Sequence, residues 1–293
     1  MSNICPVCKS TQLKTEIKVK DYFLTAEEFE LVLCESCGVL FTWPQPTLEK
    51  IGRYYDSQEY FSHGGKTKGI VPAMYNGIKK INIQTKFKQV TKDLEKGSLL
   101  DIGCGIGDFL AFAKSCGWNV RGLEPNEQAR EVVAEKHEIF AEDVSAINKL
   151  SDNSFNLITM FHVLEHVHDL DALLIEIIRI LKPGGRLVVA LPNNLSWDAK
   201  QYKMYWAGYD VPRHLYHFNP ESFAALINKF PLQKDKIVPM KWDAYYVSLL
   251  SEKYSKHNLP LLRAGINGFI SNLKARRTGN YSSLMYFYNK TNK

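Results

Sequence analysis

Short apolar runs and amphipathic segments alternate through the middle of this chain. Apolar runs bounded by turn residues predict buried strands, and an apolar period of about 3.6 residues predicts helices. We expect strands at residues 98–102, 119–124, 139–142, 155–160 and 185–191. We expect helices at residues 108–116, 126–136 and 168–181, the last ended by Pro183-Gly184-Gly185. Strands that alternate with helices favour parallel pairing and right-handed crossovers, so the pattern predicts a doubly wound α/β sheet.

The segments on either side of this core carry further periodic patterns. Residues 71–96 have the pattern of an amphipathic helix that leads into the first strand. Near the other end, residues 236–250 and 282–290 have the pattern of two more strands, which brings the expected sheet to seven. Residues 256–279, which contain three glycines, are expected to form an inserted helical segment between these two strands.

The first core strand ends in a glycine-rich turn that carries an acid. The string LLDIGCGIGDF places Asp101 just before glycines at positions 103, 105 and 107. A dinucleotide fingerprint would need a further glycine at position 108, where this chain has Asp108. A carboxylate beside the turn repels a pyrophosphate and attracts an amino group, and Glu124 follows at a spacing suited to ribose hydroxyls. These features favour S-adenosylmethionine, which has an amine, a carboxylate and a ribose but no phosphate.

Several strings of this region, taken together, lead to a family resemblance. From about residue 85 onward, the chain resembles the class I S-adenosylmethionine-dependent methyltransferases. The matching strings, in the order and spacing of that family, are LLDIGCGIGDF (99–109), GLEPN (122–126), AEDV (141–144), FNLITMFHVLEHVHD (155–169) and LKPGGRLVVALPN (181–193). The resemblance implies a Rossmann-like seven-stranded sheet closed by an antiparallel pair, with S-adenosylmethionine as the cofactor.

The same resemblance implies roles for individual residues, carried over by position. The methionine end of the cofactor would lie against the glycine turn, and Glu124 would bind the ribose hydroxyls. Asp143 and the backbone of Val144 would meet the adenine edge, while Phe161 and His162 would face the sulfonium. The complete expected cofactor set is Asp101, Gly103, Cys104, Gly105, Glu124, Pro125, Asp143, Val144, Phe161 and His162.

Two CxxC pairs near the start of the chain predict a metal site. The four cysteines are Cys5, Cys8, Cys34 and Cys37, with 25 residues between the two pairs. This spacing is typical of a zinc ribbon, and four thiolates close the coordination sphere, so the zinc would be structural. Disulfides are the alternative, but they are unusual in a chain without a secretion signal, because its thiols are kept reduced. We therefore expect a zinc ribbon at residues 1–42, with Cys104 and Cys116 as packing residues elsewhere.

Residues 43–84 are expected to connect the ribbon to a methyltransferase domain at residues 85–293. The connector is unusually aromatic, with Trp43, Tyr54, Tyr55, Tyr60, Phe61 and His63 in one short stretch. Linkers are usually polar, so this composition indicates a segment that packs over something. A lid over the donor pocket and ordinary packing between domains are both open interpretations.

The acceptor chemistry is expected to lie after the fifth core strand. Methyl transfer to a hydroxyl or carbon acid requires removal of a proton, and histidine is suited to this near neutral pH. His214 is the candidate base, with Tyr216 beside it in a string that partly resembles ubiquinone-type O-methyltransferases. His166 is the rival base. The structural alternatives are that Arg213 and His214 only anchor a loop, and that His166 caps a helix.

The net charge of +6 arises at the C-terminal end of the chain. From Lys253 onward there are eight Lys or Arg residues and no Asp or Glu. This segment could face an anionic substrate, a membrane surface or nucleic acid, or it could be an ordinary solvated face. No apolar run approaches the ~20 residues of a membrane span, and no leader-like segment begins the chain. We therefore expect no membrane span and a cytoplasmic protein.

Two classes of methyltransferase fit these features, along with a non-catalytic protein that only binds the cofactor. The first acts on a hydroxyl or carbon of a small molecule, such as a sugar, a lipid-linked compound or a secondary metabolite. The second is an RNA methyltransferase with a zinc ribbon. Residues 1–40 are rich in acids, which disfavours phosphate binding and makes a nucleic-acid partner the weaker expectation. The [DN]-P-P-[YF] string of nitrogen methylation is absent, because FHVLEH stands in its place.

Overall fold

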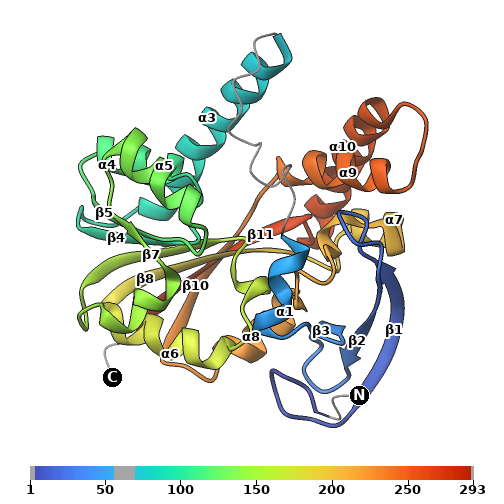
Figure 1. Cartoon of the computed structure of the whole chain (residues 1–293), viewed down its shortest axis with the longest axis horizontal. Helices are drawn as coiled ribbons and strands as arrows, with labels where there is room; N and C mark the ends of the chain where they lie inside the picture. Colours follow the sequence, from blue (N-terminus) through green and yellow to red (C-terminus); the bar gives the residue numbers. More distant parts are fainter. Residues whose placement is uncertain (1–3, 56–69, 292–293) are drawn as a thin grey trace.

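Two sheets form the framework of the protein (Figure 1). The computed structural model describes residues 4–55 and 70–291. A seven-stranded sheet has the order β10-β11-β8-β7-β4-β5-β6, and a four-stranded sheet has the order β1-β2-β3-β9. The seven strands are β4 (Ser98–Ile102), β5 (Asn119–Leu123), β6 (Ala141–Glu142), β7 (Phe155–Phe161), β8 (Leu181–Pro192), β10 (Leu232–Pro239) and β11 (Ser283–Lys290). Strands β4 to β8 pair in parallel and β11 and β10 pair antiparallel, which confirms the predicted Rossmann-like sheet.

Helices cover both faces of the seven-stranded sheet (Figure 1). One face carries α3 (Ile70–Thr91), α4 (Asp108–Ser115) and α5 (Glu127–His137), and the other carries α6 (Leu170–Ile180) and α8 (Pro220–Ile227). The predicted helix at residues 168–181 is confirmed as α6, and the Asp169 side chain at its start accepts a hydrogen bond from the Ala172 amide. Helix α8 is capped at its start by Asn219, which forms a capping box with Ser222. Each face has its own buried apolar cluster, as the doubly wound pattern requires.

The strand predicted at residues 236–250 is wrong beyond Pro239. Strand β10 ends at Pro239, and Asp243–Tyr254 forms helix α9. The run Tyr245-Tyr246-Val247 has the composition of a strand, but Ala244, Ser248 and Ser251 are buried at helical spacing. Tertiary packing against α10 (Pro260–Thr278) decides the outcome, and α10 confirms the inserted helical segment.

The N-terminal segment does not form a separate body. Strands β1 (Leu13–Lys20), β2 (Glu28–Cys34) and β3 (Leu40–Trp43) form a meander, and β9 (Tyr216–His217) extends it from far along the chain. Cys5 and Phe41 belong to the same buried cluster as residues of the large sheet. The expected boundary at residue 42 is therefore crossed by both a sheet and a core.

Only part of the aromatic connector lies in the described structure. It contains helix α1 (Leu48–Ile51) and the 3-10 turn η1 (Gly52–Tyr54), and the Tyr54 ring is buried against the N-terminal sheet. Tyr60, Phe61 and His63 lie outside the described residues, so the lid interpretation stays a prediction. Across the described chain, no helix has both the length and the apolar character that a bilayer crossing requires.

Candidate active site

The glycine turn after β4 forms the floor of the candidate cofactor site. Gly103 has φ of 72°, and a Cβ atom there would lie 2.3 Å from Val163 Cγ2, so no other residue fits. The Gly103 amide donates to the carbonyl of Leu123 at 2.6 Å, which fixes the turn against the end of β5. Gly107, also in the left-handed region, then begins α4. The backbone thus bends sharply at the carboxyl end of the strand, where cofactors bind in such sheets.

Two buried carboxylates flank this turn. Asp101 accepts a 2.6 Å hydrogen bond from Thr159 Oγ1, and burial raises the pKa of Asp101 to about 7 despite that bond. Glu124 accepts hydrogen bonds from the amides of Gly105 at 2.9 Å and Asn126 at 3.0 Å. Burial also raises the pKa of Glu124. A ligand that brings an amine to one acid and hydroxyls to the other would compensate both buried groups.

The remaining predicted cofactor residues lie around the same edge of the sheet. The Asp143 carboxylate accepts hydrogen bonds from Ser145 and is exposed, and the Val144 backbone follows it. The Pro125 carbonyl accepts a hydrogen bond from Arg130. Cys104 is buried, and burial raises its thiol pKa, so it is a packing residue. Their contacts with a cofactor stay predictions.

Phe161 and His162 follow β7, but their side chains have different surroundings. The Phe161 ring contacts Phe109 edge-on with centroids 5.1 Å apart, and Lys86 Nζ lies 4.9 Å from its centroid. His162 instead lies with Nε2 3.0 Å from Asp243 Oδ2, on α9. Burial lowers the pKa of His162, but the Asp243 hydrogen bond and the Glu165 carboxylate outweigh it and raise the pKa to about 9. A charged imidazole is poorly suited to contact a sulfonium.

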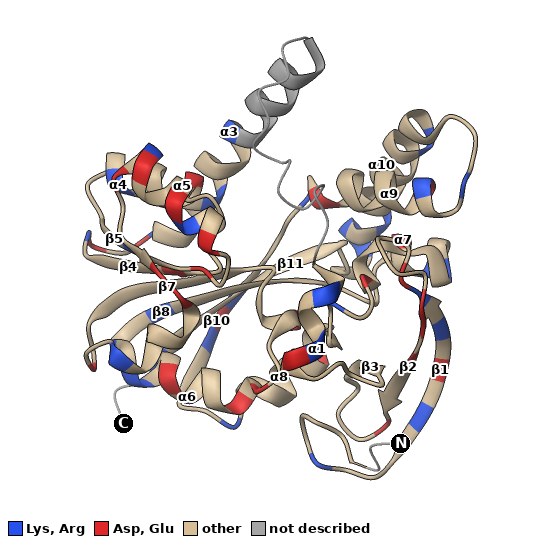
Figure 2. Cartoon of the chain, viewed as in Figure 1, with Lys and Arg blue, Asp and Glu red and all other residues tan. Residues whose placement is uncertain are grey.

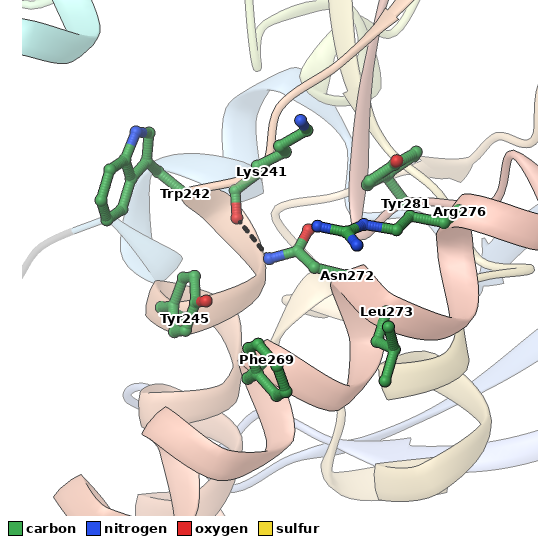
Figure 3. A pocket seen from close by; sticks show the side chains of 8 residues that line it. All are labelled: Lys241, Trp242, Tyr245, Phe269, Asn272, Leu273, Arg276 and Tyr281. Atoms are coloured by element: carbon green, nitrogen blue, oxygen red, sulfur yellow. Dashed lines mark hydrogen bonds between the residues drawn. The ribbon is translucent and has the colours of Figure 1, made fainter.

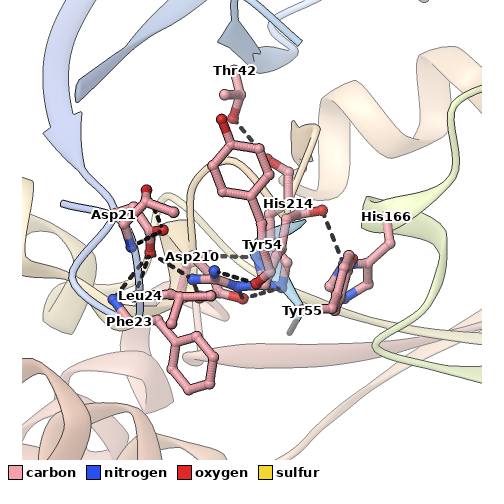
Figure 4. Close-up of polar contacts among 12 residues, drawn as sticks. Asp21, Phe23, Leu24, Thr42, Tyr54, Tyr55, His166, Asp210 and His214 are labelled. Atoms are coloured by element: carbon pink, nitrogen blue, oxygen red, sulfur yellow. Dashed lines mark hydrogen bonds and ion pairs between the residues drawn. The ribbon is translucent and has the colours of Figure 1, made fainter. Parts of the chain in front are cut away.

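A second cluster gathers Glu165, His166 and His214 (Figure 4 labels the two histidines). One ligand atom from each lies within 4.8 Å of the others, so the set could also hold a metal ion. The Glu165 side chain is buried, and neither oxygen accepts a hydrogen bond from the described residues. Its nearest basic neighbours are His162 Nδ1 at 3.5 Å and His214 Nε2 at 4.0 Å. A buried carboxylate whose oxygens accept no hydrogen bond is typical of a site that receives a ligand.

Hydrogen bonds to backbone carbonyls determine which ring nitrogens of His166 and His214 carry protons. His214 Nδ1 lies 2.9 Å from the Gly208 carbonyl, and His166 Nδ1 lies 2.9 Å from the Arg213 carbonyl. A carbonyl only accepts, so both Nδ1 atoms carry protons and both Nε2 atoms are available as acceptors. Tyr55 of the connector also contacts His166 Nδ1 at 2.9 Å. Burial and the nearby His214 lower the pKa of His166 to about 4, which keeps it neutral.

A buried ion-pair network holds the loop that carries His214 (Figure 4). Arg213 pairs with Asp210 at 2.7 Å and with Asp21 of the N-terminal segment at 3.0 Å. Burial opposes the charge of Asp210, but Arg213 outweighs it and lowers the pKa of the carboxyl. Thr42 Oγ1 also donates to the His214 carbonyl at 2.7 Å. The N-terminal segment therefore positions His214.

Tyr216, predicted beside the base, does not join this cluster. Its hydroxyl donates to the His168 carbonyl at 3.1 Å, and its ring stacks on Phe218 in the apolar core. Burial raises the pKa of the phenol to about 12. His217, the next residue, contacts Thr42 through Nε2 at 3.1 Å. Tyr216 therefore lies away from the histidine pair, whereas the His217 ring contacts β3 and lies with its centroid 6.4 Å from that of His214.

A comparison with known protein families decides the identity of this fold. The family described as "Methyltransferase domain" matches residues 82–236, which is more than half of the 293-residue chain. The chain belongs to this methyltransferase family. The match covers the glycine turn, both buried carboxylates and the histidine pair.

Curated relatives of this methyltransferase match over part of their length. A ubiquinone biosynthesis O-methyltransferase from Rickettsia conorii is 23% identical over 148 residues, which is 49% of this chain and 49% of the relative. A demethylmenaquinone methyltransferase from Lactobacillus johnsonii is 31% identical over 160 residues, which is 46% of this chain and 66% of the relative. The methyltransferase thus spans about half to two thirds of the lengths of these relatives.

Solved structures show the same fold. Phosphoethanolamine N-methyltransferase 2 from Haemonchus contortus superposes with a TM-score of 0.57 at 17% identity, covering 95% of this chain and 68% of that one. Geranyl diphosphate C-methyltransferase from Streptomyces coelicolor superposes with a TM-score of 0.54 at 14% identity, covering 80% and 87%. At these identities the likeness concerns the fold of the methyltransferase.

The four predicted zinc ligands of the methyltransferase lie together at the start of the chain. Cys5 Sγ lies 3.7 Å from Cys37 Sγ, and Cys8 Sγ lies 3.5 Å from Cys34 Sγ. All four sulfur atoms lie within 4.8 Å of one another. Tetrahedral zinc with Zn–S bonds of about 2.3 Å requires sulfur atoms about 3.8 Å apart. The thiol set therefore fits a closed zinc site.

Three residues of the site escaped the sequence analysis. Asp210 and Asp243 contact the histidines from distant segments, and Lys86 on α3 reaches the Phe161 ring. Tyr55 was noted only as one of several connector aromatics. The acids and the lysine carry no motif, and only the fold brings them to this edge. An arrangement of polar side chains after β7 was the available signal, and it pointed to His162 and His166 alone.

Proposed function

We propose that the protein transfers the methyl group of S-adenosylmethionine to a hydroxyl or carbon of a small molecule. The observation that carries this proposal is the pair of buried carboxylates, Asp101 and Glu124, on either side of a left-handed glycine turn. Asp101 would hold the amino group and Glu124 the ribose hydroxyls. When bound, S-adenosylmethionine supplies an electrophilic methyl group on a sulfonium.

In this proposal the histidine pair prepares the acceptor. His214 is the base, because its free Nε2 lies 4.0 Å from both Glu165 and Asp210, whose carboxylates would stabilise the imidazolium formed on proton uptake. His166, with its pKa lowered to about 4, is a weaker base and would orient the acceptor through Nε2. Burial of Glu165 and His214 would limit the access of water to the reacting groups.

The charge of the N-terminal sheet and the names of related methyltransferases both bear on whether the methyl acceptor is a small molecule or an RNA. The first 40 residues hold six acids and four lysines, and Glu16 and Glu30 pair with Lys14 and Lys18, so the N-terminal sheet offers no excess of positive charge to the phosphates of an RNA. The relatives and solved structures described above carry names of methyltransferases that act on quinone precursors, geranyl diphosphate or phosphoethanolamine, all of which are small molecules. Both points support a small-molecule acceptor over the RNA alternative. RNA binding that weakens steeply with salt would reverse this choice.

We further propose that zinc on Cys5, Cys8, Cys34 and Cys37 is structural and that the N-terminal segment works as part of the catalytic unit. The support is the shared sheet and the Asp21–Arg213 ion pair at 3.0 Å. The metal would join the segment before β1 to the end of β2 and the loop after it, and through β3 it would fix the position of His214.

Binding of S-adenosylhomocysteine tests the proposed cofactor-binding role of Glu124. Calorimetry is expected to show binding that weakens about 30-fold or more in Glu124→Ala, because charge-assisted hydrogen bonds contribute about 1.5–3 kcal/mol each. Glu127→Ala, an exposed acid on the adjacent helix, is the matched control and should bind like the parent protein. Equal affinity in both variants, or preference for a nicotinamide dinucleotide, would contradict the proposal.

The raised pKa of Asp101 gives a separate prediction about pH. The ligand ammonium pairs only with the ionised carboxylate, and the pKa in the free protein is about 7. Affinity for S-adenosylhomocysteine is therefore expected to fall about tenfold per pH unit below pH 7 and to level off above it. Calorimetry between pH 5.5 and 8.5 measures this slope. Asp101→Asn should remove it, whereas Asp152→Asn, an exposed control, should retain it.

A further inference from the structure

Helix α10 buries its small side chains and exposes its large apolar ones. The side chains that it buries are small: Ala264, Gly268, Ser271 and Ala275. The opposite face exposes a stripe at helical spacing, formed by Leu262, Ile266, Phe269 and Leu273, each between 48% and 60% exposed. A surface helix ordinarily turns its large apolar stripe toward the core. Here the fold leaves that stripe in solvent.

Close helix packing explains why the small residues face inward. A Cβ atom at Gly268 would lie 2.6 Å from the Tyr245 ring of α9, so only glycine allows this approach. Ser271 Oγ donates to the buried Asp198 carboxylate at 2.6 Å, which fixes the other side of the same face. The orientation of α10 is thereby determined by its small residues. The exposed apolar stripe makes no contribution to this packing and calls for another role.

The stripe continues across the helical hairpin formed by α9 and α10. Trp242 and Tyr246, before and within α9, are each about half exposed. A pocket of about 280 Å³ lies between the two helices, with Trp242, Phe269 and Leu273 in its lining (Figure 3). Of the 17 large apolar side chains exposed in the described structure, eight lie within residues 242–273. Exposed apolar patches of this kind mark interaction sites.

Positive charge surrounds the apolar patch. Lys241 and Arg276 line the pocket itself (Figure 3), and Lys274 and Arg277 lie on the same helix. Within residues 4–55 and 70–291, none of these four has an ion-pair partner within 4.0 Å. Residues 253–278 contain no acid at all, and Figure 2 shows blue segments without red on α10.

We propose that the α9–α10 hairpin docks on the surface of a membrane that contains anionic lipids. An apolar stripe flanked by unpaired Lys and Arg matches the boundary between acyl chains and negative headgroups. Lys241 and Arg276 would receive lipid phosphates at the pocket, and Phe269 and Leu262 would enter the acyl boundary. A second copy of this chain is the weaker occupant, because a two-fold interface would bring like charges together.

Vesicle flotation tests the docking proposal. The protein is expected to float with vesicles of phosphatidylcholine and phosphatidylglycerol, and to bind pure phosphatidylcholine vesicles at least tenfold more weakly. The double variant Leu262→Ser/Phe269→Ser and the charge variant Lys274→Glu/Arg277→Glu should each lose at least tenfold in vesicle affinity. Ile175→Ser, a similarly exposed apolar residue on α6, is the matched control and should bind like the parent protein.

The remaining outcomes have defined meanings. Circular dichroism and thermal unfolding establish that each variant is folded. Equal binding to both kinds of vesicle, or equal binding by all variants, would overturn the proposal. A concentration-dependent dimer in sedimentation, abolished by Leu262→Ser/Phe269→Ser in the absence of vesicle binding, would assign the patch to a second copy instead. None of these readouts depends on methyl transfer, so they stand apart from the test of the proposed function.

Discussion

Replacing His214 with alanine is expected to lower kcat/KM for methyl transfer about 100- to 10,000-fold, the range typical of general-base catalysis. His214 has a free Nε2 beside two carboxylates, and Gly208 holds its other nitrogen. Removal of the ring eliminates the proton acceptor without touching the cofactor carboxylates. Affinity for S-adenosylhomocysteine should therefore stay within about twofold of the parent protein, so the loss is expected in the chemical step.

Substitutions of His166 and Tyr216, the other two predicted catalytic residues, are expected to have much smaller effects than His214→Ala. His166→Ala is expected to cost about tenfold, because a group with a pKa of about 4 is a poor base at neutral pH. Tyr216→Phe removes a hydroxyl bound to the His168 carbonyl and should leave kcat/KM nearly unchanged. An initial-rate assay with labelled S-adenosylmethionine measures all three variants. A greater loss in His166→Ala than in His214→Ala would exchange the roles of the two histidines.

The second large effect is expected from the zinc site. Cys34→Ser should lower the free energy of unfolding by about 3–5 kcal/mol. Structural zinc contributes about 10–16 kcal/mol in small zinc-finger peptides, and loss of one of the four thiolates removes part of that contribution. Cys34 is fully buried at the end of β2, so loss of the metal leaves thiols in the shared core. Methyl transfer should fall as well, since β3 and Thr42 hold the His214 backbone.

Metal analysis and thermal unfolding measure this prediction. The parent protein should carry about one zinc ion per chain, and Cys34→Ser should carry much less. Cys116→Ser is the matched control, because Cys116 lies outside the four-cysteine cluster and should retain metal, stability and activity. A parent protein without zinc, or a Cys34→Ser variant with unchanged stability, would contradict a structural metal.

Local patterns predicted most of the fold, and the exceptions have identifiable causes. The glycine turn, the helix that begins after Asp169 and the parallel pairing of the core strands all follow from short-range sequence rules. Helix α9 was misassigned because Tyr245 and its neighbours have strand-like composition, while packing of small residues against α10 favours a helix. Propensity is weak compared with burial, so tertiary contacts decide such segments.

The candidate site divides in the same way. Asp101 and Glu124 could be named from sequence because each lies at a fixed distance from a turn or strand end. His166 and His214 could be named as candidates, but their shared contact with Glu165 comes from segments 48 residues apart. Sequence patterns carry no information on such a meeting, since it depends on how one loop packs on another.

What the sequence alone determined is the set of positions whose chemistry is local, namely the cofactor turn and the spacing of the four cysteines. A turn or a CxxC pair is fixed by a few bond rotations, so its residues can be read in order. Only the tertiary structure decided that the N-terminal sheet takes β9 into its edge and that α10 exposes its large apolar face. Both outcomes depend on competition for burial among distant segments, which no local pattern records.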